Sequence, residues 1–319
     1  MRVYVYRWDL DKTYLETDFD SLRGLMRSAT EPASAKRAVP GAAALMRALS
    51  AHQGSKVYIV SGSPTQLRPV LEEKLRLDGV TFEHLALKDS LAHLKKGELR
   101  AIKGQVGYKL PTLLEGRQGL GRAVRETLFG DDAEVDALVY SIYADVLAGR
   151  IGPAELSRLM EAAGAYPARI EAALQAAGRL STADVVDRIF IRLDRGRPPE
   201  DFAALGGRLV PIYSWWQAAL VLLQDGLLDP AGAGEVLEAW LVETGQDDWA
   251  AAGLAQDLVR RGFIGAELAD RVEGPEAARE AARRAIRRGS ASSPPLRSPA
   301  SIDYLSLLRG WNRRAKERA

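Results

Sequence analysis

Short apolar runs alternate with segments of helical periodicity along the first 148 residues. The runs rich in β-branched and aromatic residues predict strands over residues 3–8, 56–60, 81–87 and 123–129. The periodic segments predict helices over residues 41–52, 66–77 and 134–147. Strands separated by helices of this length predict an α/β fold, a Rossmann-like parallel sheet with helices on both faces. The predicted first domain is residues 1–148.

The pattern changes beyond residue 149, where helix signals continue and no convincing strand is present. We therefore expect an all-α domain over residues 149–288. Within it, residues 209–228 form the most apolar run. Because Gln217, Gln224 and Asp225 interrupt this run, it predicts a buried helix rather than a membrane span.

The C-terminal region divides into a linker and a tail. Residues 289–301 are rich in Ser and Pro, which predicts a disordered linker. Residues 302–319 form a short basic amphipathic segment. One interpretation is contact with an anionic membrane surface or another protein, and a frayed, solvated tail is the favoured alternative. The Arg-rich residues 279–288 similarly favour a solvated helix face over a nucleic-acid-binding stripe.

Composition excludes several kinds of chemistry. The 319 residues include no Cys, which rules out disulfides, thiol catalysis and zinc–thiolate sites, and only three His. Lys and Arg (44) nearly balance Asp and Glu (42), so neither a global nucleic-acid-binding field nor a specific nucleic-acid motif is indicated. Arg7 and Asp9 interrupt the apolar N-terminus. We therefore expect no signal peptide and a cytoplasmic protein.

An acidic motif, Asp9-x-Asp11-x-Thr13, follows the first predicted strand. Ligands of open α/β sheets bind at the carboxyl ends of the strands. A carboxylate there can attack phosphorus, which makes Asp9 a candidate nucleophile. Asp11 can then act as general acid and base on the other oxygen, with Thr13 in support. Alone, such a motif is also typical of an ordinary acidic turn.

Two later motifs offer groups that hold a phosphate. Ser61 and Gly62 follow the second predicted strand, where a hydroxyl and backbone amides can bind phosphoryl oxygens. The alternative is a plain helix N-cap, for which Ser63 is the better candidate. Lys109 can neutralise charge on the transferring oxygens and hold Asp9, although a lone lysine is more often a surface residue.

Three further carboxylates follow the predicted strand over residues 123–129. Asp131 is the candidate metal ligand, Asp132 the candidate helix cap, and Asp136 a partner for Lys109 or for a metal-bound water. Because Asp9 and a phosphate repel each other, a bridging Mg²⁺ together with Lys109 makes their approach feasible.

These four motifs, in this order and each at its expected strand end, resemble the haloacid dehalogenase (HAD) superfamily over residues 1–148. The resemblance implies a Mg²⁺-dependent phosphatase with Asp9 as nucleophile and Asp11 as general acid and base. It implies Mg²⁺ on the Asp9 and Asp131 carboxylates and the Asp11 backbone carbonyl. Ser61 and Lys109 then bind the phosphoryl group.

A narrower resemblance depends on Gly130-Asp131 followed by Asp136 and Tyr140, with Tyr108-Lys109 and residues 61–64 upstream. These residues resemble the phosphatidate phosphatase catalytic domain of the fungal actin-patch protein and its bacterial relatives. One departure is Lys12, where the fungal form has an acidic residue.

Spacing offers a hint about the substrate. Thr13 and Ser61 are separated by 47 residues, as are Ser61 and Lys109, and neither interval has room for a large cap domain. An open site suits a bulky substrate such as a lipid head group, a protein or a polynucleotide, although the helical half can still cover the site. Among these, the resemblance makes phosphatidate the leading candidate. A polynucleotide or protein phosphatase of the same fold and a non-enzymatic binding module remain alternatives. The complete motif set argues against the last. Oligomeric state is not indicated.

Overall fold

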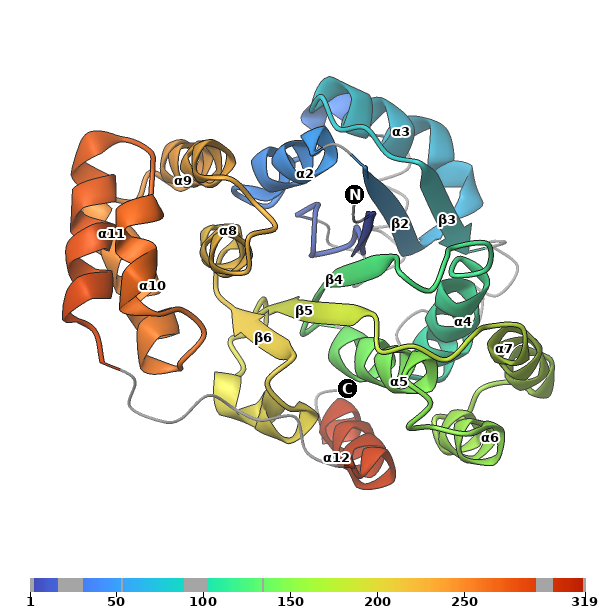
Figure 1. Cartoon of the computed structure of the whole chain (residues 1–319). Helices are drawn as coiled ribbons and strands as arrows, with labels where there is room; N and C mark the ends of the chain where they lie inside the picture. The colour runs from blue at the N-terminus through green and yellow to red at the C-terminus, as the bar shows by residue number, and fades with distance from the viewer. Residues whose placement is uncertain are drawn as a thin grey trace.

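Within the described residues, six parallel strands form a single sheet in the order β3-β2-β1-β4-β5-β6 (Figure 1). The strands are β1 (Tyr4–Trp8), β2 (Ser55–Pro64), β3 (His84–Lys88), β4 (Arg125–Asp131), β5 (Val186–Arg192) and β6 (Leu209–Ile212). This computed structural model describes residues 3–16, 31–52, 54–88, 102–133, 135–290 and 301–317. The predicted α/β class with a parallel sheet is confirmed.

Helices cover both faces of the sheet in two layers (Figure 1). The α-helices are α2 (Ala42–Ala51), α3 (Arg68–Leu77), α4 (Ile102–Glu115), α5 (Asp136–Leu147), α6 (Pro153–Ala162), α7 (Pro167–Gly178), α8 (Trp215–Gln224), α9 (Pro230–Thr244), α10 (Asp248–Arg260), α11 (Glu276–Arg288) and α12 (Tyr304–Glu317). Short 3-10 helices are η1 (Ala33–Ala35), η2 (Thr65–Leu67), η4 (Pro199–Leu205) and η5 (Ala266–Arg271). Helices α2, α3 and α8 cover one face, with α9, α10 and α11 outside them. Helices α4 and α5 cover the other, with α6, α7 and α12 outside.

Within the described residues, no helix combines the length and apolar character needed to cross a membrane.

The expectation that residues 149–288 contain no strand is wrong, because β5 and β6 extend the sheet beyond β4. The signal of β5 was hidden by Asp187, Arg188 and Arg192, whose charges interrupt its apolar alternation. The predicted helix over 209–228 is divided into β6 and α8. Ser214 begins α8 by accepting a hydrogen bond from the Gln217 amide.

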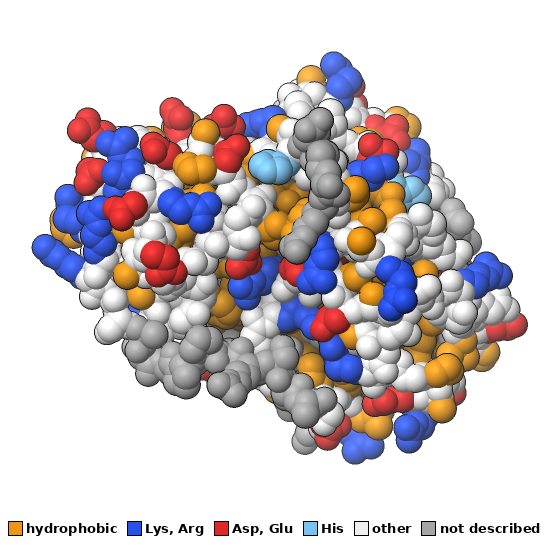
Figure 2. All heavy atoms as spheres, viewed as in Figure 1, with side chains coloured by type: hydrophobic (Ala, Val, Ile, Leu, Met, Phe, Trp, Pro, Cys, Tyr) orange, Lys and Arg blue, Asp and Glu red, His pale blue; other side chains and the backbone are white. Residues whose placement is uncertain are grey.

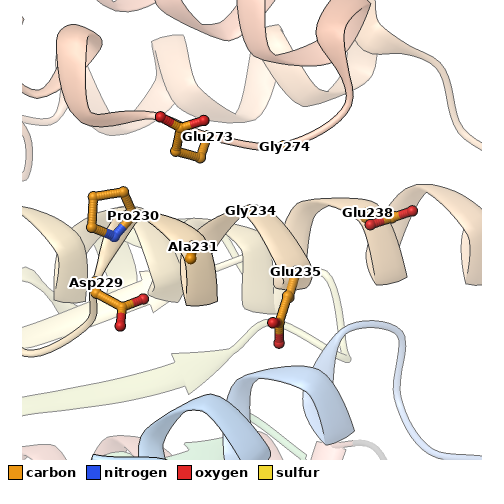
Figure 3. A pocket seen from close by; sticks show the side chains of 8 residues that line it. All are labelled: Asp229, Pro230, Ala231, Gly234, Glu235, Glu238, Glu273 and Gly274. Atoms are coloured by element: carbon orange, nitrogen blue, oxygen red, sulfur yellow. The ribbon is translucent and has the colours of Figure 1, made fainter.

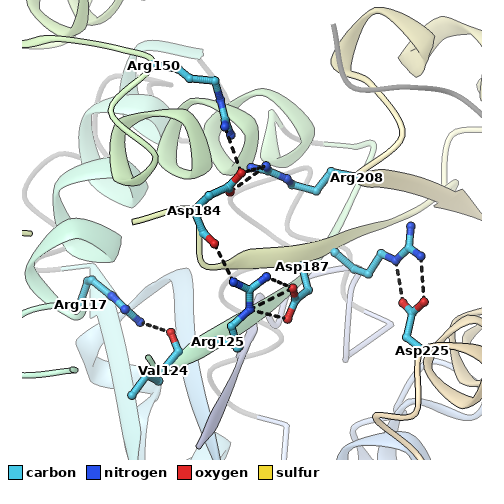
Figure 4. A network of polar contacts seen from close by, with 9 residues as sticks. Arg117, Val124, Arg125, Arg150, Asp184, Asp187, Arg208 and Asp225 are labelled. Carbon is cyan, nitrogen blue, oxygen red and sulfur yellow. Dashed lines mark hydrogen bonds and ion pairs between the residues drawn. The ribbon is translucent and has the colours of Figure 1, made fainter. Parts of the chain in front are cut away.

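A polar network joins the two halves of the chain across the predicted boundary at residue 149 (Figure 4). Arg125 of β4 pairs with Asp187 of β5 and donates to the Asp184 carbonyl at 2.6 Å. The Asp184 carboxylate also accepts hydrogen bonds from Arg150 at 3.1 Å and Arg208 at 2.9 Å. The sheet and this network make residues up to β6 part of one structural unit with the first 148.

The C-terminal helix α12 is docked on the protein, so a frayed tail is the wrong interpretation for its described side chains. Tyr304, Leu308 and Trp311 are buried in the core on the α5 face. The Tyr304 hydroxyl donates to Asp145 at 2.7 Å, and the Arg197 guanidinium lies 5.2 Å from the Trp311 ring. The predicted linker falls mainly on residues 291–300, which lie outside the described residues.

A fully buried charge network lies beneath the sheet on the α5 face. Arg7 of β1 donates to both carboxylate oxygens of Glu126, at 2.9 and 3.0 Å. Arg117 and Tyr143 donate to the same carboxylate at 2.9 and 2.6 Å. Burial alone raises the pKa of Glu126, but Arg7, Arg117 and Tyr143 outweigh it and lower the pKa below its usual 4.5.

We expect Glu126→Gln to lower the free energy of unfolding by about 3–5 kcal/mol, because two buried guanidinium groups lose their counter-charge. Because the folded-state pKa is depressed, this stabilisation is present above the unfolded pKa and is lost as pH falls through the folded pKa. Urea denaturation of wild type and variant, at neutral pH and in acid, measures this difference.

Glu72→Gln is the matched control for this measurement. It removes an exposed pair with Arg68 at 3.0 Å and should change stability by at most about 0.5 kcal/mol. A Glu126→Gln effect equally small, or one independent of pH, contradicts the stabilising role of the network.

Candidate active site

The acidic motifs meet at the carboxyl ends of β1 and β4. Strands β2 and β3 are added on one side of β1 and strands β4 to β6 on the other, so the order of the strands switches between β1 and β4. Asp9 directly follows β1, and its amide donates to the Phe129 carbonyl of β4 at 3.0 Å. Asp131 ends β4. Both carboxylates are completely buried. This switch point is where open α/β sheets bind their ligands.

Lys109 reaches the site from the middle of α4 and not from a strand end, which corrects the expectation from sequence. Its Nζ lies 2.9 Å from Asp9 Oδ1 and 2.5 Å from Asp136 Oδ1, and all three side chains are fully buried. The alternative of a surface lysine is therefore excluded. One ammonium bridges the carboxylate after β1 and the carboxylate in the first turn of α5.

Thr13 connects Asp9 with Asp131. Its Oγ1 lies 3.2 Å from Asp9 Oδ2 and 3.0 Å from Asp131 Oδ2. The other oxygen of Asp131 accepts a hydrogen bond from the Ala133 amide at 2.6 Å, which fixes the carboxylate at the strand end. A hydroxyl has one proton and can donate to one carboxylate at a time.

The charges of this group suit a divalent cation. Asp9, Asp131 and Asp136 each offer an oxygen within 4.8 Å of the others, and all three are buried. Lys109 contacts two of these three carboxylates, those of Asp9 and Asp136. Carboxylate oxygens are the hard ligands that Mg²⁺ prefers. The residues present thus fit a bound Mg²⁺.

The Asp11 carboxylate turns away from this group toward β2. Its Oδ2 accepts hydrogen bonds from Ser61 at 3.0 Å and from Ser63 at 2.8 Å. Ser63 is therefore not a helix N-cap, because neither η2 nor α3 has a side-chain cap. Strand β2 continues to Pro64, so Ser63 belongs to the strand and its side chain reaches Asp11.

Gly62, between these serines, lies beside Gln105 of α4. A Cβ on Gly62 would approach the Gln105 amide to 3.3 Å, so a side chain there would crowd it. Sequence reasoning missed Gln105. The signal was present, because Gln105 precedes Lys109 by four residues and so shares its face of the helix.

Asp132 does not cap α5, contrary to the expectation from sequence, and instead binds the backbone of the loop that contains Arg195. The N-cap of α5 is Val135 and has no side-chain hydrogen bond. Asp132 Oδ1 instead accepts from the Arg195 amide at 2.8 Å. Burial raises the pKa of Asp132, although hydrogen bonds from the Arg195 and Arg197 amides act in the opposite direction.

Gly130 is required where β4 meets α5. A Cβ at this position would lie 2.5 Å from Asp136 Oδ2 and 2.8 Å from a Tyr140 ring carbon. Only glycine lets Asp136 approach the end of β4 and reach Lys109.

Three further residues near the acidic motifs carry no signal in the sequence. Arg192 and Trp215 donate to the backbone carbonyls of Lys12 and Thr13, respectively. Lys36 is nearly buried. Burial lowers its pKa, whereas the charges of Glu31 and Asp11 act in the opposite direction. Arg192 and Trp215 lie about 180 to 200 residues from the carbonyls that accept these hydrogen bonds.

A shallow pocket lies apart from these motifs, between α9 and the segment before α11 (Figure 3). Its acidic lining residues are Asp229, Glu235, Glu238 and Glu273. Asp229 is already engaged as the N-cap of α9. Within the described part of the chain, only the Asp9 group brings three potential metal ligands within 4.8 Å of one another. We therefore place the candidate site at Asp9.

Comparison with known proteins agrees with this choice. Neither the curated proteins nor the solved structures include a match to this chain. One family model matches, described as phosphatidate phosphatase APP1, catalytic domain, and the match covers residues 8–153. Asp9, Asp11, Ser61, Lys109 and Asp131 all lie within it. Residues 8–153 thus resemble the catalytic domain of phosphatidate phosphatase APP1, as the motifs predicted.

Proposed function

We propose that this protein is a Mg²⁺-dependent phosphatase of the HAD type that hydrolyses a phosphomonoester, with phosphatidate as the leading substrate. One observation supports this most strongly: Asp9 lies at the switch point of the sheet between a buried lysine and a second buried carboxylate. The resemblance of the same segment to the APP1 catalytic domain supports the choice of phosphatidate.

The proposed reaction has two steps. An Asp9 oxygen attacks phosphorus, and the bond from phosphorus to the ester oxygen breaks. Asp11 gives its proton to the departing oxygen. It then takes a proton from the water that hydrolyses the aspartyl phosphate, which restores Asp9. The hydrogen bond from Ser63 holds the Asp11 carboxylate on the β2 side of Asp9 during both steps, and the Ser61 hydroxyl turns from Asp11 to the phosphoryl group when the substrate binds.

The remaining groups neutralise or bind the negative charge of Asp9 and the phosphate. Mg²⁺, when bound by the Asp9 and Asp131 carboxylates and the Asp11 backbone carbonyl, reduces repulsion between Asp9 and the phosphate. We assign Asp136 mainly to Lys109, because their 2.5 Å contact already engages that carboxylate. Lys109 neutralises charge on the transferring oxygens. Ser61 and the backbone at Gly62 bind the phosphoryl group from the other side.

Among the residues that the structure describes, no feature favours a polynucleotide substrate. The Arg-rich helix α11 carries acidic neighbours, since Arg283 and Arg287 pair with Glu280 and Asp270 at 3.3 and 2.6 Å. Figure 2 shows basic and acidic side chains intermixed over this region. Cap insertions would fall on residues 17–30 and 89–101, which lie outside the described residues. Membrane contact through the C-terminal segment stays a prediction.

Asp9→Asn should abolish Mg²⁺-dependent hydrolysis of an aryl phosphate, lowering kcat by roughly a thousandfold or more, because the amide cannot form the phosphoenzyme. Steady-state kinetics with and without a chelator measure this. Asp270→Asn, which alters an exposed pair with Arg287, should keep wild-type turnover. Unchanged turnover in Asp9→Asn would rule out its role as nucleophile.

Substrate class can be tested with a panel of phosphates, using Asp9→Asn as the blank. We expect the highest kcat/KM on phosphatidate in mixed micelles, above a phosphopeptide, a 5′-phosphorylated oligonucleotide and a sugar phosphate. A clear preference for the oligonucleotide or the phosphopeptide would support the alternative of a polynucleotide or protein phosphatase and reject the lipid.

Gly130→Ala should lower kcat by roughly tenfold or more, because its methyl group displaces Asp136 from Lys109. Gly253→Ala is the matched control. Gly253 lies in α10 with no atom near its added Cβ, so this change should leave turnover intact and stabilise the fold slightly. Equal kinetics in the two variants would contradict the steric requirement at Gly130.

A further inference from the structure

We propose that Arg192 is a positioning residue that fixes the Asp9–Thr13 loop relative to Asp131. Arg192 ends β5 and lies outside the segment that matches the family model. This inference rests on the proposed function, because it assigns to the second half of the chain a part in the same reaction.

The loop needs external support because its backbone is strained. Lys12 has a φ of +62°, the only positive φ of a non-glycine residue in the described part of the chain. An L-residue in this conformation costs on the order of 1–3 kcal/mol and persists only when its surroundings hold it. Lys12 separates Asp11 from Thr13, so its conformation sets where both side chains point.

Two side chains from the second half of the chain hold this backbone. Arg192 donates to the Lys12 carbonyl through Nε at 2.9 Å and Nη2 at 2.6 Å. The Trp215 indole donates to the next carbonyl, that of Thr13, at 3.1 Å. Trp215 is fully buried, and its ring lies 5.0 Å from that of Trp8. Two donors on successive carbonyls define the orientation of the loop.

Arg192 also contacts the second acidic loop. Its backbone carbonyl accepts a hydrogen bond at 3.0 Å from the amide of Asp132, the residue that directly follows Asp131. The guanidinium is kept in place by Asp194, at 2.5 Å. A single residue therefore connects the loop that carries Asp9 and Asp11 with the loop that carries Asp131.

The chemistry is sensitive to this connection. In the proposed reaction, Asp9 and Asp131 would both hold the cation while Asp9 faces phosphorus, and Asp11 must reach the departing oxygen. A displacement of about 1 Å in such a geometry can cost around a hundredfold in rate. Loss of the Arg192 side chain should therefore affect turnover and metal binding more than substrate affinity.

The test compares Arg192→Gln with Arg188→Gln. Arg188 lies on the same strand and also forms a two-point contact, with Asp225 at 2.7 and 2.9 Å, away from the site. We expect Arg192→Gln to lower kcat by about ten- to a hundredfold with KM changed by at most about twofold. Arg188→Gln should keep wild-type kinetics.

A second readout does not depend on turnover. Because Mg²⁺ binds the folded state, it should raise the Tm of wild type and of Arg188→Gln, and raise the Tm of Arg192→Gln clearly less. Arg192→Gln with the kinetics and Mg²⁺ response of Arg188→Gln would overturn the positioning role while leaving the proposed function intact. A wild type without phosphatase activity would instead overturn the proposed function.

Discussion

The Lys109 ammonium bridges the Asp9 and Asp136 carboxylates in a place from which solvent is excluded. An isolated buried carboxylate is costly, so each of these groups depends on the others for its charge. Much of the local architecture follows from this cluster. Gly130 lacks a side chain so that Asp136 can approach, and α4 runs past the sheet so that Lys109 reaches Asp9.

The same constraint favours a divalent cation. The Asp9, Asp131 and Asp136 oxygens lie within 4.8 Å of one another, which is close enough for them to share one ion. The Asp11 carboxylate is drawn away from this group by two serines of β2, and in the proposed reaction it transfers the proton from that position. In the proposed reaction, charge neutralisation falls to Lys109 of α4, which is held by Asp136 of α5, whereas proton transfer falls to Asp11, which is held by β2.

The two halves of the chain are more interdependent than a catalytic domain followed by helices would suggest. Strands β5 and β6 complete the sheet, and α12 returns to cover α5. Arg125 of the first half contacts Asp184 and Asp187 of the second, which fixes β5 beside β4. Because Arg192 ends β5, the position of that strand also sets the position of the Asp9 loop.

Local pattern alone determined the first four strands, the parallel sheet and the residues that gather at its switch point. Asp9, Ser61 and Asp131 were readable because parallel strands place their carboxyl ends at one edge. What required the tertiary structure were features with no local periodicity: β5, whose apolar pattern is interrupted by charges, and the role of Ser63 beside Asp11. Arg192 and Trp215 lie about 180 to 200 residues from the carbonyls they hold. Only the order of strands in space brings them there, because a hydrogen bond to a backbone carbonyl leaves no mark on the sequence of the loop that accepts it.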